Sequence, residues 1–273
     1  MCPRLLEIGP FTIYSYGLML ATGFIVASYL LTAELKRKQI DPNIGNNVTL
    51  IAVVAGIAGS KLLFLMEHWT QFMADPIGMA FSPTGLTFYG GFLLATLMIF
   101  LYTRKQKVRF FSVADAVSPG LILGYGIARL GCHFAGDGDY GFPTDLPWGT
   151  DYSNGTYPPS LAFRSFPEIT SQYPGGIVPD NVLCHPTPVY ELLFCAIIFS
   201  ILWRYRTSIL GEGKMFMLYL MLAGLERFSI EFLRLNPRLA FGLSEAQLIA
   251  IGLMVVGLTG WMYLSGKHRT KGA

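Results

Sequence analysis

Seven long apolar stretches are the feature that most limits how this chain can fold. They cover residues 15–33, 48–66, 86–103, 113–131, 188–206, 214–232 and 244–264. A helix needs about 20 mostly apolar residues to cross the hydrocarbon core of a bilayer, and each stretch approaches or reaches that length. Only 14% of the residues are charged, against roughly 25% in a soluble globular domain. The sequence therefore predicts an all-α polytopic membrane protein with seven transmembrane helices, forming a single membrane domain over residues 1–273.

The distribution of Lys and Arg predicts the orientation of these helices. One set of connections holds most of the basic residues, namely Lys36, Arg37, Lys38, Arg104, Lys105, Lys107, Arg109, Arg204, Arg206, Lys214, Lys267, Arg269 and Lys271. The opposite side holds only Arg4, Arg164, Arg234 and Arg238. Because cytoplasmic connections carry the excess of Lys and Arg, the N-terminus is expected outside and the C-terminus in the cytoplasm. The net charge of +3 follows from this bias and gives no reason to expect nucleic-acid binding.

The one long connection, residues 132–187, is rich in Gly, Pro, Tyr and Asp and lacks a sustained helical or alternating period. It predicts an irregular external head on the membrane surface, where the aromatic residues Trp148, Tyr152, Tyr157 and Tyr173 would suit the interface. Cys132 and Cys184 flank this segment and could pair. A second external piece, residues 67–85, has no basic residue and is expected to form a short amphipathic arm.

Ionisable residues interrupt the apolar stretches near their predicted outer ends. A charge inside a bilayer costs several kcal/mol, so Lys61, Arg129, Arg227 and Glu231 are candidates for a functional site. Arg227 and Glu231 are one helical turn apart and can form a pair, which could also be purely structural. Tyrosines at the same level could belong to this layer or to an ordinary interfacial belt; they are Tyr14, Tyr16, Tyr89 and Tyr190, the last followed by Glu191.

Arg129 is the strongest candidate for binding a ligand. Glycines flank it on both sides, which lets backbone approach a ligand closely, although glycines at this spacing also serve helix packing. The guanidinium fork matches phosphate, and the phosphate available at this depth belongs to a phospholipid head group. We therefore expect Arg129 to hold a lipid phosphate.

Other polar residues near Arg129 allow more than one interpretation. The run Asp137-Gly138-Asp139 could bind a cation, but such acids are more often solvated turn residues. His133 and His185 could act as general bases or could be structural. The sequence contains no serine nucleophile elbow, zinc HExxH motif or phosphate-binding loop.

Five blocks of sequence are distributed along the chain: Tyr14-Ser15-Tyr16-Gly17-Leu18-Met19, Phe88-Tyr89-Gly90-Gly91, Ala128-Arg129-Leu130-Gly131 with Gly136 and Gly141, His185-Pro186-Thr187-Pro188-Val189-Tyr190-Glu191, and Arg227-Phe228-Ser229-Ile230-Glu231-Phe232-Leu233-Arg234. In their order and spacing, these blocks together resemble the prolipoprotein diacylglyceryl transferase family. The chain departs from the family pattern in carrying Tyr89 where the family usually has His. It also carries Ala128 for Gly, Cys132 and Ala135 for two Asn, and Asp137 for Glu.

The resemblance implies transfer of a diacylglyceryl group from phosphatidylglycerol to the lipobox cysteine of a preprolipoprotein, with release of glycerol phosphate. It implies a bacterial inner-membrane protein that works at the outer leaflet among membrane lipids and needs neither a metal nor an organic cofactor. The implied phosphate site comprises Arg129, Tyr16 and Gly141, with Lys61, Asp137 and Tyr190 in support.

The catalytic candidates are Arg227, Glu231, Tyr89 and His133, and the last three remain alternatives for the general base. A phospholipid-binding paralogue without transferase activity, or with altered specificity, is the second interpretation. A transporter or receptor is disfavoured because the ionisable residues lie in one outer layer without a polar line to the cytoplasm.

Overall fold

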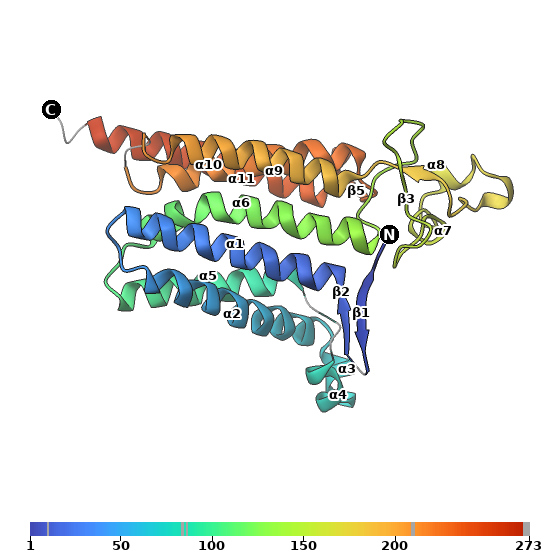
Figure 1. The fold of residues 1–273 in the computed structure, drawn as a ribbon, viewed down its shortest axis with the longest axis horizontal. Helices are drawn as coiled ribbons and strands as arrows, with labels where there is room; N and C mark the ends of the chain where they lie inside the picture. The colour runs from blue at the N-terminus through green and yellow to red at the C-terminus, as the bar shows by residue number, and fades with distance from the viewer. Residues whose placement is uncertain (10, 83–84, 86, 209–210, 270–273) are drawn as a thin grey trace. The chain divides into compact units, whose positions relative to one another are not determined.

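The computed structural model describes residues 1–9, 11–82, 85, 87–208 and 211–269, which are mostly helical (Figure 1). The long helices are α1 (Ser15–Arg37), α2 (Asn43–Glu67), α5 (Phe88–Lys105), α6 (Phe110–Ala135), α9 (Thr187–Tyr205), α10 (Lys214–Ile230) and α11 (Glu245–Arg269). The short helices are α3 (Trp69–Ala74), α4 (Pro76–Phe81), α7 (Pro159–Ala162), α8 (Pro167–Thr170), η1 (Pro174–Gly176) and η2 (Glu231–Leu233). The strands are β1 (Arg4–Ile8), β2 (Phe11–Tyr14), β3 (Thr150–Asp151), β4 (Leu183–Cys184), β5 (Arg238–Ala240) and β6 (Leu243–Ser244).

Each predicted transmembrane stretch overlaps one of the long helices. Residue 86, the predicted start of one stretch, lies outside the described residues. Lys271, one of the basic residues expected on the cytoplasmic side, also lies outside them. Within the described residues, five helices are long and apolar enough to span a membrane: α1, α2, α6, α9 and the Glu245–Gly266 part of α11. The other two are shorter: α5 has 18 residues and ends in Arg104-Lys105, and α10 has 17 residues that include Glu226 and Arg227. The chain is a multi-pass helical membrane protein.

Contacts divide the chain into two compact units, each described by itself: Met1–Tyr29 with Val117–Ala273, and Leu30–Ala116. Glycines bring helices of the first unit close together. A Cβ on Gly23 of α1 would lie 2.6 Å from the carbonyl oxygen of Gly124 in α6, and one on Gly224 of α10 would lie 2.7 Å from that of Ala250 in α11. Since real Cβ atoms do not approach so closely, these crossings require glycine and follow the small-residue rule for membrane helices.

The second unit is built in the same way. A Cβ on Gly59 of α2 would lie 2.3 Å from the carbonyl oxygen of Gly90 in α5, so these helices also meet through glycine. The Lys61 ammonium donates to the carbonyl of Ser82 at 2.9 Å and lies 5.4 Å from the Phe64 ring centroid. Residues 67–85, the predicted amphipathic arm, include the short helices α3 and α4.

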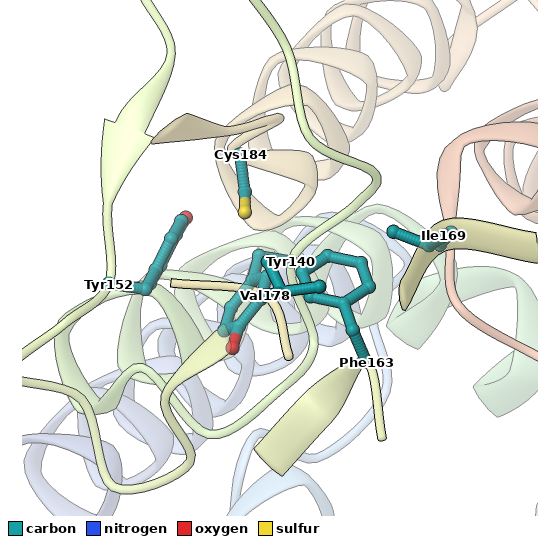
Figure 2. Close-up of a cluster of buried hydrophobic side chains, with 6 residues drawn as sticks. All are labelled: Tyr140, Tyr152, Phe163, Ile169, Val178 and Cys184. Carbon is teal, nitrogen blue, oxygen red and sulfur yellow. The ribbon is translucent and has the colours of Figure 1, made fainter. Parts of the chain in front are cut away.

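The head over 132–187 has no long helix or strand after α6 ends at Ala135, which agrees with its predicted irregularity. Its short strands β3 and β4 pair antiparallel. Its core contains Tyr140, Tyr152, Phe163, Ile169, Val178 and Cys184 (Figure 2). Tyr140 and Tyr152 stack with ring centroids 4.2 Å apart.

One expectation about the head is wrong. Tyr152 is fully buried in the head core rather than placed at the membrane interface, because its ring stacks on Tyr140. The pairing of Cys132 and Cys184, which the sequence left open, is absent, since both are free thiols. Burial in the head core raises the pKa of Cys184 to about 12, which keeps this thiol protonated and unreactive.

Candidate functional site

The Arg227 and Glu231 side chains form the ion pair expected from their spacing. Nη2 of Arg227 lies 2.9 Å from Oε2 of Glu231, which is fully buried. Oε1 of Glu231 accepts hydrogen bonds at 2.7 Å from both Asn236 and Ser244. Glu231 is therefore held in one orientation, and it fixes the guanidinium of Arg227 in turn.

Glu191, one turn into α9, is the centre of a larger network. Its fully buried carboxylate lies 3.1 Å from Nε of Arg129, 3.2 Å from Nη1 of Arg227 and 3.4 Å from Nη1 of Arg234. The Tyr125 hydroxyl donates to the same carboxylate at 3.3 Å. Glu191 therefore holds together arginines from three segments of the chain. Removing one partner of a buried ion pair costs about 3–5 kcal/mol, so this arrangement depends on the Glu191 charge.

Asp139 is the second bridge between the arginines. Its two carboxylate oxygens contact Nη1 of Arg129 and Nη2 of Arg234, respectively. Although partial burial alone would raise the pKa of Asp139, Arg234 and then Arg129 outweigh burial and hold that pKa below its ordinary value. Asp139 is therefore ionised at neutral pH. Arg129, Arg227 and Arg234 with Asp139, Glu191 and Glu231 form one connected set of ion pairs, which we call the arginine network.

The loop after α6 is held against the start of α9 and the end of η2. The Thr187 hydroxyl donates to the Asp139 carbonyl at 2.7 Å, and Gly141 forms a β-bridge with Arg234. A Cβ on Gly141 would lie 2.3 Å from the carbonyl oxygen of Leu233, so only glycine allows this approach. The bridge places Asp139 and Arg234 close enough to pair, although 95 residues separate them in sequence.

The exposure of the network side chains shows which groups a ligand can reach. The carboxylates of Glu191 and Glu231 are fully buried, whereas the side chains of Arg129 and Arg227 remain 18% and 24% exposed. The Arg129 guanidinium also lies 4.8 Å from the Tyr125 ring centroid and 3.7 Å from the Cys132 sulfur. Buried carboxylates thus orient two partly exposed arginine side chains, a residue type whose planar guanidinium suits an anion such as phosphate.

The other predicted site residues of the first unit surround this network in different ways. Tyr16 is close enough to interact electrostatically with Arg129 and Cys132. His133 contacts the Tyr152 hydroxyl at 3.0 Å and therefore engages the head core. Tyr190 accepts a hydrogen bond from Trp148 at 2.7 Å.

Asp137 lies beside the network. It accepts a hydrogen bond from the Asp139 amide at 3.3 Å. Partial removal from water, and then repulsion from Asp139, raise its pKa. Lys61 and Tyr89 belong to the second unit, and their participation in the site stays a prediction.

Three members of the network were not among the predicted site residues. Glu191 lies at the predicted outer level, but its sequence context does not distinguish it from the neighbouring Tyr190. Asp139 has the sequence context of a solvated turn acid, and Arg234 falls among the external charges. Two of the resemblance blocks end in Glu191 and Arg234, which is a local signal for both residues. Arg234 also follows Glu231 by three residues and Arg227 by seven, a spacing that would share one face if the helix continued.

The potential cation site is better explained by the arginines. Ligand atoms of Cys132, Asp137 and Asp139 lie within 4.8 Å of one another, close enough to share a metal ion. However, Arg129 contacts both Cys132 and Asp139, and Arg234 contacts Asp139 as well. These guanidinium groups already supply positive charge at the cluster, so the geometry does not require a metal.

The chain matches the family model for prolipoprotein diacylglyceryl transferase over residues 3–263. Proteins named phosphatidylglycerol–prolipoprotein diacylglyceryl transferase are similar to it along almost their whole length. The protein from Clostridium tetani is 29% identical, covering 94% of this chain and 96% of its own. The proteins from Trichormus variabilis and Synechococcus elongatus are each 30% identical, covering 96% and 98% of this chain and 90% and 89% of their own, respectively. The chain therefore belongs to the prolipoprotein diacylglyceryl transferase family.

Proposed function

We propose that this chain transfers the diacylglyceryl group of phosphatidylglycerol to the cysteine thiol of a prolipoprotein. The main support, beyond family membership, is the arginine network, in which the partly exposed side chains of Arg129 and Arg227 are oriented by buried carboxylates. Such forks suit a phosphate ester in a low-dielectric site.

In the proposed reaction, the cysteine sulfur attacks the carbon of the diacylglyceryl group that is bonded to the phosphate oxygen. A C–S bond forms, the C–O bond to phosphate breaks, and glycerol phosphate leaves with the bond electrons. The thiol proton passes to a base. Since a free cysteine has a pKa near 8.5, both deprotonation and stabilisation of the leaving phosphate lower the barrier.

The contacts favour distinct roles for the network residues. Arg129 binds the phosphate, Arg227 supports it, and Glu191 and Glu231 orient the two arginines. Because Glu231 already contacts Arg227 and accepts two hydrogen bonds, it is better suited to this orienting role than to accepting the thiol proton.

The remaining site assignments belong to the same proposal. With Glu231 assigned to orienting Arg227, His133 and Tyr89 are the candidates for the general base. Tyr16 and Gly141 would contribute to lipid binding, with Lys61, Asp137 and Tyr190 in support.

We also propose seven transmembrane spans in a bacterial inner membrane, with the N-terminus outside, the C-terminus in the cytoplasm and the reaction at the outer leaflet. The predicted distribution of Lys and Arg supports this orientation. The natural partners would then be outer-leaflet phosphatidylglycerol and prolipoproteins with a lipobox cysteine.

The test supplies purified protein with phosphatidylglycerol and a lipobox-cysteine peptide and measures release of glycerol phosphate. We expect wild-type activity, a large loss in Arg129→Ala, and normal activity in Arg164→Ala, which removes an exposed head arginine outside the network. Full activity of Arg129→Ala would exclude its phosphate role.

Cys132 lies 3.7 Å from Arg129 where the family pattern has Asn, and this observation favours a lipid-binding paralogue as the second candidate. Bound phosphatidylglycerol without glycerol phosphate release by the wild type would support that alternative.

A further inference from the structure

The β5–β6 hairpin, residues 238–244, joins η2 to α11 and has an unusual turn. Its strands pair antiparallel around Phe241 and Gly242, whose φ angles are 54° and 72°. Two positive φ angles are typical of the tight hairpin turn that favours Asn or Gly at both positions. A bulky aromatic residue is rare at such an angle. The strained position of Phe241 therefore points to a role for its side chain.

The tip of the hairpin presents apolar side chains away from the protein. Phe241 is 98% exposed and Leu239 is 65% exposed. The adjacent Arg238 is also exposed, although one of its guanidinium nitrogens donates to Gln247 of α11 at 2.8 Å. Two apolar side chains beside a basic one form the combination that suits the boundary between acyl chains and lipid head groups.

The base of the hairpin is fixed by hydrogen bonds. Ser244 and Asn236 both donate to Oε1 of Glu231 at 2.7 Å, and the Ser244 amide donates to Gln247 at 3.1 Å. These contacts connect the hairpin directly to Glu231, which pairs with Arg227 in the arginine network.

The length of α11 places the hairpin at the edge of the bilayer. The membrane-spanning part of α11, Glu245–Gly266, begins directly after β6. Its 22 residues correspond to about 33 Å of helix, close to the roughly 30 Å hydrocarbon core, so Glu245 lies near one edge of that core. Phe241 is three residues before Ser244, a reach of about 10 Å along a strand. Figure 1 shows β5 at the end of α10 and α11 that also carries the head.

We propose that the β5–β6 hairpin is a lipid-contacting element that inserts Leu239 and Phe241 among the acyl chains beside the arginine network. Arg238 then lies at the level of the lipid phosphates. Continuity with the transmembrane surface of α11 identifies the bilayer as the partner. The proposal holds whether or not the chain is catalytically active, because it depends only on membrane placement.

Spin-label accessibility tests this placement. Phe241→Cys and Leu239→Cys are made separately with Cys2→Ser, which removes the exposed native thiol and leaves three buried ones. The labelled proteins are reconstituted in vesicles of phosphatidylcholine and phosphatidylglycerol. Collision with oxygen, which concentrates in lipid, is compared with collision with a water-soluble nickel chelate. Ser171→Cys, at an exposed polar position on the head, provides the comparison site, and the Cys2→Ser protein provides the blank.

We expect labels at 239 and 241 to collide with oxygen at least several-fold more often, relative to the nickel chelate, than the label at 171. A label at 241 that meets the chelate as often as the label at 171 would overturn the proposal. The second label position keeps the test decisive if one variant is poorly expressed, and no step requires transferase activity.

Discussion

Asp139→Asn tests whether bridging by a carboxylate positions the arginines. The substitution keeps the shape of the side chain but removes the charge that contacts both Arg129 and Arg234. Breaking a fully buried pair costs about 3–5 kcal/mol, and the Asp139 side chain is 32% exposed, so we expect a smaller loss of about 1–2 kcal/mol in the free energy of unfolding. If the transition state loses the same ~1–2 kcal/mol of stabilisation, kcat decreases by about 5- to 30-fold.

The assay measures thermal unfolding in detergent and glycerol phosphate release over a range of phosphatidylglycerol concentrations. Because Asp139 competes with a phosphate for Arg129, we expect KM for the lipid to stay unchanged or decrease while kcat decreases. Asp145→Asn, which neutralises an exposed head carboxylate, serves as the matched control. Wild-type Tm and kcat in Asp139→Asn would refute the argument that this bridge positions the arginines.

Three further substitutions test other parts of the account. Glu191→Gln leaves three arginines without their shared buried charge, and we expect unfolding to become easier by about 3–5 kcal/mol, with loss of activity; a Tm within one degree of wild type would contradict this. Gly141→Ala would push a Cβ against the Leu233 carbonyl, so both Tm and activity should fall; unchanged values would show that the bridge can relax. The raised pKa of Asp137 means that its ionised form destabilises the fold, so Asp137→Asn should raise Tm at pH 7, with the gain shrinking as the pH falls toward about 4. A gain that grew on acidification would have the wrong sign.

Most of the membrane helices could be predicted because their signal is local. Apolar stretches of bilayer length are continuous in sequence, and the structure places α9 within one residue of its predicted ends at 188 and 206. The pair of Arg227 and Glu231 was likewise predictable, because both residues lie on one helix at a spacing that brings them together.

The rest of the network depends on contacts between distant segments. Asp139 has the local sequence of a turn acid, and only the bridge between Gly141 and Arg234 brings it to an arginine 95 residues away. The same reason explains Tyr152, whose tyrosine ring is equally suited to an interface and to a core. Stacking on Tyr140 places Tyr152 in the core, and the sequence around Tyr152 does not reveal this partner.

The central claim is that Arg129 binds the phosphate of the lipid substrate. The most direct test measures which lipid the protein retains. Native mass spectrometry of the detergent-purified protein, titrated with equal amounts of phosphatidylglycerol and diacylglycerol, compares a lipid that has the phosphate with one that lacks it. We predict that wild type and Arg164→Gln prefer phosphatidylglycerol strongly, and that Arg129→Gln loses most of this preference while remaining folded. An equal preference in Arg129→Gln and wild type would contradict the account.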